Sequence, residues 1–222
     1  RRETTAGRRS RALGCTAVLR HRLVASVLAL SALAVTSACS DGGSDELSAV
    51  EDGGGAGRST SGGEPIGAAV EGVEGVEAFR VDSHEHTEDP LDYAYSPPVG
   101  GEHFPVPATC GFYEGDVPPD ELLVHDLEHG AIWIAYDPAL DPAQITAISE
   151  LVARQAKVVA TPREGLATPI VVSAWARQLA LDSVDDPRIG QFIDTYRNSA
   201  NAPEPNAACQ GVGEPAVPSP TA

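Results

Sequence analysis

An apolar segment that ends at a cysteine limits which part of this chain can form a folded core. Arginines lead into an uncharged, mostly apolar run over 23–38, and Cys39 follows it directly. A charged start, a short apolar stretch and small residues before a cleavage site are typical of a secretory signal. The run is shorter than the roughly 20 residues of a membrane-spanning helix. We therefore expect 1–39 to be an export signal outside the folded domain.

Cys39 is a candidate lipidation site. The small residues over 35–38 resemble a bacterial lipobox, in which the cysteine thiol is acylated and becomes the new N-terminus, although Thr36 stands where an aliphatic residue is commoner. We expect the lipid on Cys39 to anchor the protein to the extracytoplasmic face of the cell membrane. The alternatives are an uncleaved anchor and an ordinary secretory signal in which Cys39 is incidental.

The remaining chain divides into a linker, one domain and a tail. Residues 40–65 are rich in glycine, serine and acidic side chains, which predicts a flexible tether. Residues 213–222 are predicted to be a disordered tail. The segment 66–212 between them has the length of one ordinary domain.

The part after Cys39 is strongly acidic. Seven arginines and one glutamate precede Cys39, so the 15 basic and 32 acidic residues of the chain leave 8 and 31 after it. Such a charge repels nucleic acid and anionic lipid headgroups, and we expect no nucleic-acid partner. General solubility is the simpler explanation of the charge itself.

The pattern over 66–212 predicts an α+β fold. We expect one small, mostly antiparallel sheet covered by about three helices. Proline and glycine interrupt any periodicity over 82–107, which predicts a long loop before the first helix. The expected elements are strands over 73–81, 131–136, 157–160 and 169–175, and helices over 119–129, 141–155 and from 186 onward.

Two cysteines, Cys110 and Cys209, remain for the domain. Cys15 lies in the predicted export signal and Cys39 is the candidate lipid site. In an oxidising compartment, two remaining cysteines most simply pair. A free buried thiol at each place is the alternative.

The predicted helix 119–129 contains the pattern H-x-x-E-H. Residues four apart on a helix lie one above the other, so His125 and His129 can reach one metal ion, and Glu128 lies beside them. The spelling resembles that of inverzincin metalloproteases, in which the glutamate is the base, but those proteases are built on much larger domains. The alternative is a histidine pair that only hydrogen-bonds loop backbone.

Five of the six histidines lie between 84 and 129. The loop before the helix can bring His103, and with it His86, to the His125/His129 pair. Several neutral imidazoles with few thiols suit a transition metal such as zinc or copper. His84 is left out of the expected site.

An ordered series of motifs resembles the bacterial DUF3105 family over roughly 66–212. It comprises P-P-V-G-G-E-H, C-G-F-Y-E, L-V-H-D-L-E-H-G, S-A-W-A-R-Q-L and P-E-P before the last cysteine. Members typically show a histidine near the start of the domain, which matches His86, and a P-P-x-x-G-x-H motif, which matches His103. They also show an L-E-H-G motif, matching His129, with a histidine three before its glutamate, matching His125. The family name denotes unknown function, so the resemblance implies residues but no reaction.

The sequence therefore predicts a lipid-anchored extracytoplasmic domain that binds a divalent transition metal. We expect His125 and His129 as primary ligands, His103 as the third and His86 as the fourth. One alternative is a metal-dependent hydrolase with Glu128 as general base. A second alternative is an interaction domain without metal.

Overall fold

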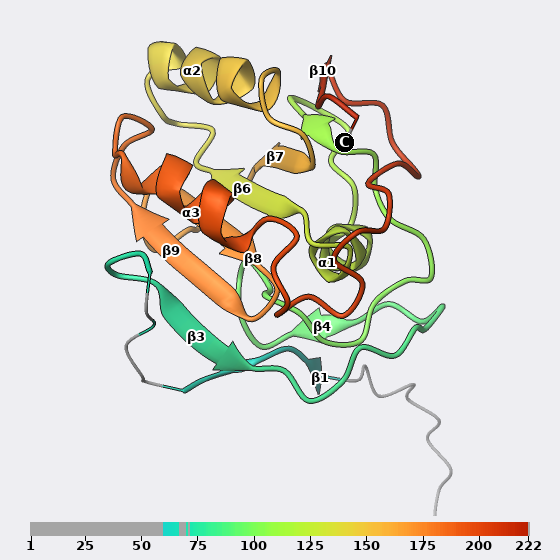
Figure 1. Cartoon of the computed structure of the whole chain (residues 1–222). Coiled ribbons are helices and arrows are strands. Elements are labelled where there is room, and N and C mark those ends of the chain that lie inside the picture. Colours follow the sequence, from blue (N-terminus) through green and yellow to red (C-terminus); the bar gives the residue numbers. More distant parts are fainter. Residues whose placement is uncertain (1–59, 67–69, 71, 222) are drawn as a thin grey trace, which may run out of the picture. The chain divides into compact units, whose positions relative to one another are not determined.

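The computed structural model of this chain describes residues 60–66, 70 and 72–221. The predicted export signal with Cys39 lies outside these residues, and so does most of the predicted linker. The described residues form three helices and ten strands, which confirms the α+β class (Figure 1). In this part of the chain, no helix is long and apolar enough to cross a membrane.

Most strands belong to one sheet of eight, in the order β10-β5-β7-β6-β8-β9-β3-β2. In chain order they are β2 (Glu64–Pro65), β3 (Glu77–Arg80), β5 (Gly111–Phe112), β6 (Ile132–Tyr136), β7 (Val158–Pro162), β8 (Ile170–Ala174), β9 (Arg177–Leu181) and β10 (Val217–Pro218). The pairs β5–β7 and β6–β7 are parallel, and the others are antiparallel. Two further strands, β1 (Thr60–Ser61) and β4 (Asp92–Tyr93), form a separate parallel pair.

The sheet is larger than the small, mostly antiparallel one that was expected, and it is mixed, because it includes two parallel strand pairs. A helix connects β6 to β7, and such a crossover returns the chain to the same end of the sheet, so its two flanking strands run parallel. The outer strands β2, β5 and β10 are only two residues long and show no periodic pattern that a sequence could reveal.

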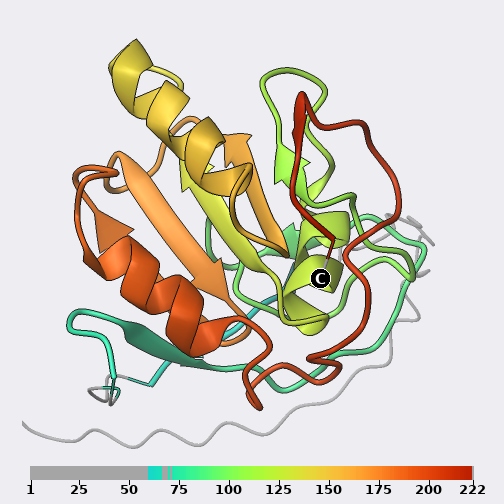
Figure 2. The same ribbon diagram turned by 45° about the horizontal axis from the view of Figure 1, so that its top comes forward.

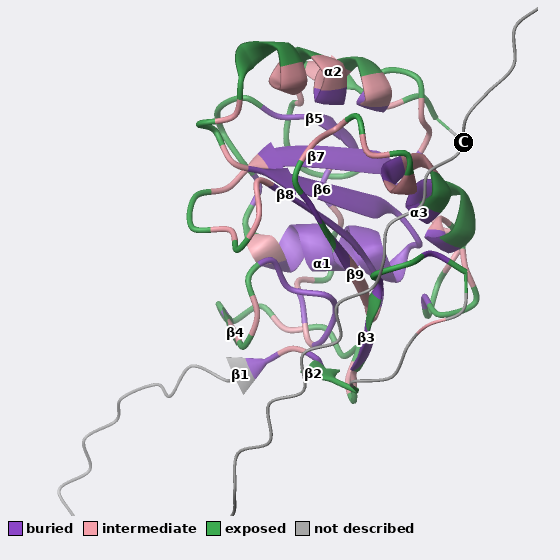
Figure 3. Cartoon of the chain, turned by 90° about the vertical axis from the view of Figure 1, so that its left-hand side faces the viewer, coloured by how far each residue is buried: buried purple, intermediate pink, exposed green. Residues whose placement is uncertain are grey.

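Helices cover both faces of the sheet. The helices are α1 (Asp120–Glu128), α2 (Pro142–Val152) and α3 (Arg188–Tyr196). In β6, Ile132 and Ile134 join a hydrophobic cluster with side chains of α2 and α3, whereas Trp133 and Ala135 join a second cluster with side chains of α1. This alternation follows from the two-residue period of a strand. Figure 2 shows α2 and α3 on the same side of the sheet, and Figure 3 shows α1 on the other.

Both ends of the described chain take part in the fold. Val217 and Pro218 pair with β5, so the prediction of a disordered tail over 213–222 is at variance with the structure. Likewise, Glu64 and Pro65, at the end of the predicted linker, pair with β3. Strand pairing uses backbone hydrogen bonds, which require no apolar pattern, and this is why neither strand was predicted.

Candidate metal site

Helix α1 places the side chains of His125, Glu128 and His129 at its C-terminal end. His125 and His129 lie one turn apart, and their ring centroids are 4.4 Å apart. Gly130 follows with a φ of 81°, the left-handed conformation that ends the helix. A Cβ at this position would lie 2.9 Å from the Cα of Asn198, so only glycine fits the close approach of that chain segment.

The long loop before α1 brings two more histidines to this helix end. His86 and His103 face each other across an isolated parallel bridge. The amide of Thr87 donates to the carbonyl of His103 at 2.8 Å, and the amide of His103 donates to Glu85 at 3.2 Å. Backbone hydrogen bonds therefore fix the two imidazoles next to each other, although they lie 17 positions apart in the sequence.

Three of the rings are held by the same kind of contact. The Nδ1 atoms of His103, His125 and His129 lie 2.6–2.8 Å from the backbone carbonyls of Gly101, Phe104 and Ala208, respectively. A carbonyl only accepts hydrogen bonds, so each Nδ1 carries a proton and donates. Each Nε2 is then directed at the other side chains. Metal-ligating histidines are typically oriented in this way by their second nitrogen.

His103 lacks an ordinary neutral state in these surroundings. Its Nε2 lies 2.9 Å from Oε2 of Glu128, while its Nδ1 already donates to Gly101. With Glu128 ionised, both neighbours are acceptors, so the Nε2 of His103 then carries a second proton or shares its lone pair with a cation. The side chain is completely buried, which makes a bare charge costly.

The pair formed by His125 and His129 has a similar requirement. Their Nε2 atoms lie 2.9 Å apart, and both Nδ1 atoms carry protons. Two neutral rings in this arrangement direct lone pairs at each other, which a proton or a metal ion must relieve. Burial lowers the pKa of His125 to about 4, although a hydrogen bond to Phe104 opposes the shift. A proton is thus poorly held on His125 at neutral pH.

Glu128 lies at the centre of the cluster. Its Oε2 contacts Nε2 of His103 and, at 3.3 Å, Nε2 of His86. Burial opposes ionisation of the carboxyl group, but hydrogen bonds and charge from His103, then His86, outweigh burial and lower its pKa. Glu128 is therefore a carboxylate at neutral pH and available as a ligand.

One group of four side chains has the geometry of a metal centre. The candidate ligand atoms of His86, His103, His125 and Glu128 all lie within 4.8 Å of one another. His86 stacks on His125, with ring centroids 5.0 Å apart and planes 13° from parallel. Its side chain is 45% exposed, whereas Glu128 is 3% exposed, so solvent reaches this group on the side of His86.

His129 belongs to a second group. Its Nε2 lies 3.6 Å from Oε2 of Glu204, and the ligand atoms of Glu128, His129 and Glu204 also lie within 4.8 Å of one another. Glu204 was not predicted from the sequence, because its position depends on how the C-terminal segment returns to α1. His84, which was not expected in the site, is exposed and belongs to neither group.

A disulfide fixes the segment that contains Glu204 and Ala208. Cys110 and Cys209 are bonded, with Cα atoms 5.5 Å apart, which confirms the predicted pairing. Asp126 lies close to the two sulfur atoms, but a disulfide has no thiolate to offer a metal.

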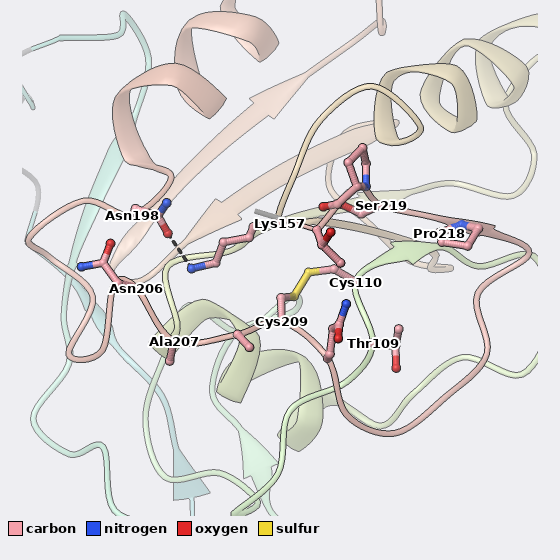
Figure 4. Close-up of a pocket in the computed structure, with 13 residues that line it drawn as sticks. Thr109, Cys110, Lys157, Asn198, Asn206, Ala207, Cys209, Pro218 and Ser219 are labelled. Carbon is pink, nitrogen blue, oxygen red and sulfur yellow. Dashed lines mark hydrogen bonds between the residues drawn. A yellow bond between two sulfur atoms is a disulfide. The ribbon is translucent and has the colours of Figure 1, made fainter.

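A pocket of about 520 Å³ adjoins this segment and is lined in part by the disulfide and by Lys157 (Figure 4). The Lys157 ammonium donates to the carbonyl of His129 at 2.6 Å, to Oδ1 of Asn198 at 2.5 Å and to the carbonyl of Pro205 at 3.2 Å. Lys157 therefore ties the end of α1 to the segment that orients His129.

Comparison with known proteins identifies a family. The family model for DUF3105, described as a protein of unknown function, matches residues 84–211. Searches among curated proteins and among solved structures found no significant match. The matched region begins before His86 and ends after Cys209, so it contains the whole histidine cluster and the disulfide. The chain therefore belongs to the DUF3105 family.

Proposed function

We propose that this domain binds a divalent transition metal ion through His86, His103, His125 and Glu128. The observation that supports this most strongly is the contact pattern of His103. Its ring is completely buried, and both of its nitrogens face acceptors, the carbonyl of Gly101 and the carboxylate of Glu128. A metal ion between Nε2 and the carboxylate satisfies both groups and neutralises the carboxylate.

The donor set is suited to zinc. Three imidazole nitrogens and one carboxylate oxygen are common zinc ligands, and copper also accepts imidazole. Ligands about 2.0–2.1 Å from zinc at tetrahedral angles are about 3.3–3.4 Å apart. The Glu128 oxygen lies 2.9 Å from His103 Nε2 and 3.3 Å from His86 Nε2, close to the spacing that a zinc ion requires.

A binding or structural role fits the site better than hydrolysis. A hydrolase needs a carboxylate that is free to take a proton from water. Glu128 instead contacts two of the candidate ligands and is almost completely buried. An interaction domain without metal would have to keep a doubly protonated His103 fully buried, which is costly unless its pairing with Glu128 compensates.

The proposal includes a location. The apolar run before Cys39 and the lipobox-like residues support export and lipid anchoring at that cysteine. Two cysteines that form a disulfide are in keeping with an oxidising compartment. In this arrangement the metal site lies outside the cell membrane.

Metal analysis of variants tests the proposal. The full chain, exported and purified without a histidine tag, is stripped with a chelator, incubated with zinc and dialysed, and its zinc is measured by elemental analysis. Wild type should retain zinc, and His103→Ala should lose it. His84→Ala is the matched control, because His84 is exposed and belongs to neither group, and it should retain zinc as wild type does.

Two results would contradict the proposal. One is a wild-type protein that retains neither zinc nor copper nor nickel after reconstitution. The other is an equal metal content in wild type and His103→Ala when circular dichroism shows that both are folded.

A further inference from the structure

The second group of candidate ligands shares one residue with the first. Glu128 belongs to both, whereas His129 and Glu204 belong only to the second. The side chain of His129 is 10% exposed and that of Glu204 is 59% exposed, so this group lies between the buried cluster and solvent. A carboxylate has two oxygens, which allows Glu128 to contact one ion with each.

Backbone contacts also position the residues of the second group. The amide of Glu204 donates to the carbonyl of Glu128 at 3.0 Å, which places Glu204 beside the end of α1. His129 is oriented by its Nδ1 hydrogen bond to Ala208 at 2.6 Å. The Nε2 lone pair of His129 is consequently directed at acceptors, Nε2 of His125 at 2.9 Å and the Glu204 carboxylate at 3.6 Å.

A cation beside the Nε2 of His129 would remove its repulsion from the Nε2 of His125 and from the Glu204 carboxylate. Nε2 of His129, the Glu204 carboxylate and the second oxygen of Glu128 are each able to donate an electron pair to a metal. An ion bound only by the first group would leave His129 facing Glu204 without a partner between them. The Glu204 carboxylate also supplies a negative charge that the inner ion does not neutralise, which favours a cation at this place.

We infer that the domain holds two divalent metal ions, with Glu128 as a bridging carboxylate between them. The inner ion is bound by His86, His103 and His125, and the outer ion by His129 and Glu204. This inference rests on the metal site proposed above. Two-ion sites with bridging ligands have ions about 3.5–4 Å apart. The outer ion has three protein ligands, so water completes its coordination and it is the more weakly bound of the two.

Native mass spectrometry of the full chain, titrated with zinc from the metal-free state, tests this inference. Wild type should bind two zinc ions in sequence. Glu204→Gln removes the charge of an outer ligand and leaves the inner ligands in place, so it should bind the first zinc normally and the second at least about tenfold more weakly. Glu214→Gln makes the same change at an exposed acidic residue outside both groups and should behave as wild type.

The outcomes separate the inference from the proposal on which it rests. One tightly bound zinc in wild type, unaffected by Glu204→Gln, overturns the second ion and leaves the single site intact. A wild-type protein that binds neither zinc nor copper nor nickel overturns both. Electron paramagnetic resonance of the copper-loaded protein provides an independent readout. Two cupric ions at this spacing are magnetically coupled, so the signal of the singly loaded protein should weaken when the second ion binds. A signal that instead doubles overturns the bridged arrangement.

Discussion

The Nε2 atoms of His125 and His129 lie 2.9 Å apart, although both rings donate from Nδ1 to a backbone carbonyl. Two neutral imidazoles held in this way repel each other through their lone pairs. The fold maintains the arrangement with contacts from distant segments, the carbonyl of Phe104 before α1 and that of Ala208 near the C-terminus. A cation shared between the two Nε2 atoms would remove this repulsion.

The metal-free protein should lose stability at acid pH through His125. Burial, opposed by a hydrogen bond to Phe104, lowers the pKa of His125 from 6.5 to about 4. Between these values the unfolded chain binds a proton that the folded chain does not. The contribution of His125 to stability is therefore fully present above about pH 6.5 and is lost as the pH falls toward 4. Urea unfolding midpoints at about pH 7.5 and 5, measured with a chelator present, should differ more in wild type than in His125→Asn. The same difference in both proteins would exclude His125 as the cause.

The sequence predicted the helix that supplies the site. Pro119 before the first turn and Gly130 after the last one bracket α1, and the spacing of His125 and His129 put both rings on one side of it. These signals come from residues close together in the chain, so they can be recognised in a single sequence. The approach of His103 was expected from its loop, and the structure shows its ring 5.0 Å from that of His125.

Other parts of the site depend on contacts that no local pattern encodes. Glu204 reaches His129 because the disulfide, Lys157 and a backbone hydrogen bond to Glu128 hold the C-terminal segment against α1. From its place in the motif, Glu128 was expected to act as a general base only in the hydrolase alternative. Its contacts with His86 and His103 come from a bridge between two loop residues, which has no periodic signature.

Replacing Lys157 should destabilise the fold. The side chain is buried, and its ammonium donates to the carbonyl of His129, to Asn198 and to the carbonyl of Pro205. Lys157→Met keeps much of the volume but leaves these acceptors without their donor, at a cost of about 1–3 kcal/mol in the free energy of unfolding. Urea titration near neutral pH measures the loss.

Arg154→Met is the control for this change. The Arg154 side chain is 66% exposed and its contact with Glu150 is on the surface, so its removal should change the free energy of unfolding by less than about 0.5 kcal/mol. Equal effects of the two variants would show that the buried ammonium contributes no more than a surface charge.

Replacing Cys39 by Ser should release the protein from the membrane or leave it unprocessed. A serine has no thiol for the lipid, and the signal would no longer be cleaved before an acylated cysteine. Fractionation of cells that express the full chain, followed by mass measurement of the product, checks this prediction. Cys15→Ser, within the predicted export signal, should leave both location and mass unchanged. A Cys39→Ser protein that remains in the membrane fraction at the mature mass of wild type would refute lipid anchoring.

Removing the disulfide should weaken both the fold and the outer part of the metal site. Cys209 is bonded to Cys110 and adjoins Ala208, whose carbonyl accepts the Nδ1 hydrogen bond of His129. Cys209→Ala should lower the free energy of unfolding by about 2–5 kcal/mol, seen as a fall of the melting temperature by several degrees. Because the segment that orients His129 is then tethered only by non-covalent contacts, affinity for the second zinc should also fall by about tenfold. Cys110→Ala breaks the same bond from the other side and should reproduce both effects. A variant with the lower melting temperature but the zinc affinity of wild type would show that Lys157 and the backbone hold Ala208 in place without the disulfide.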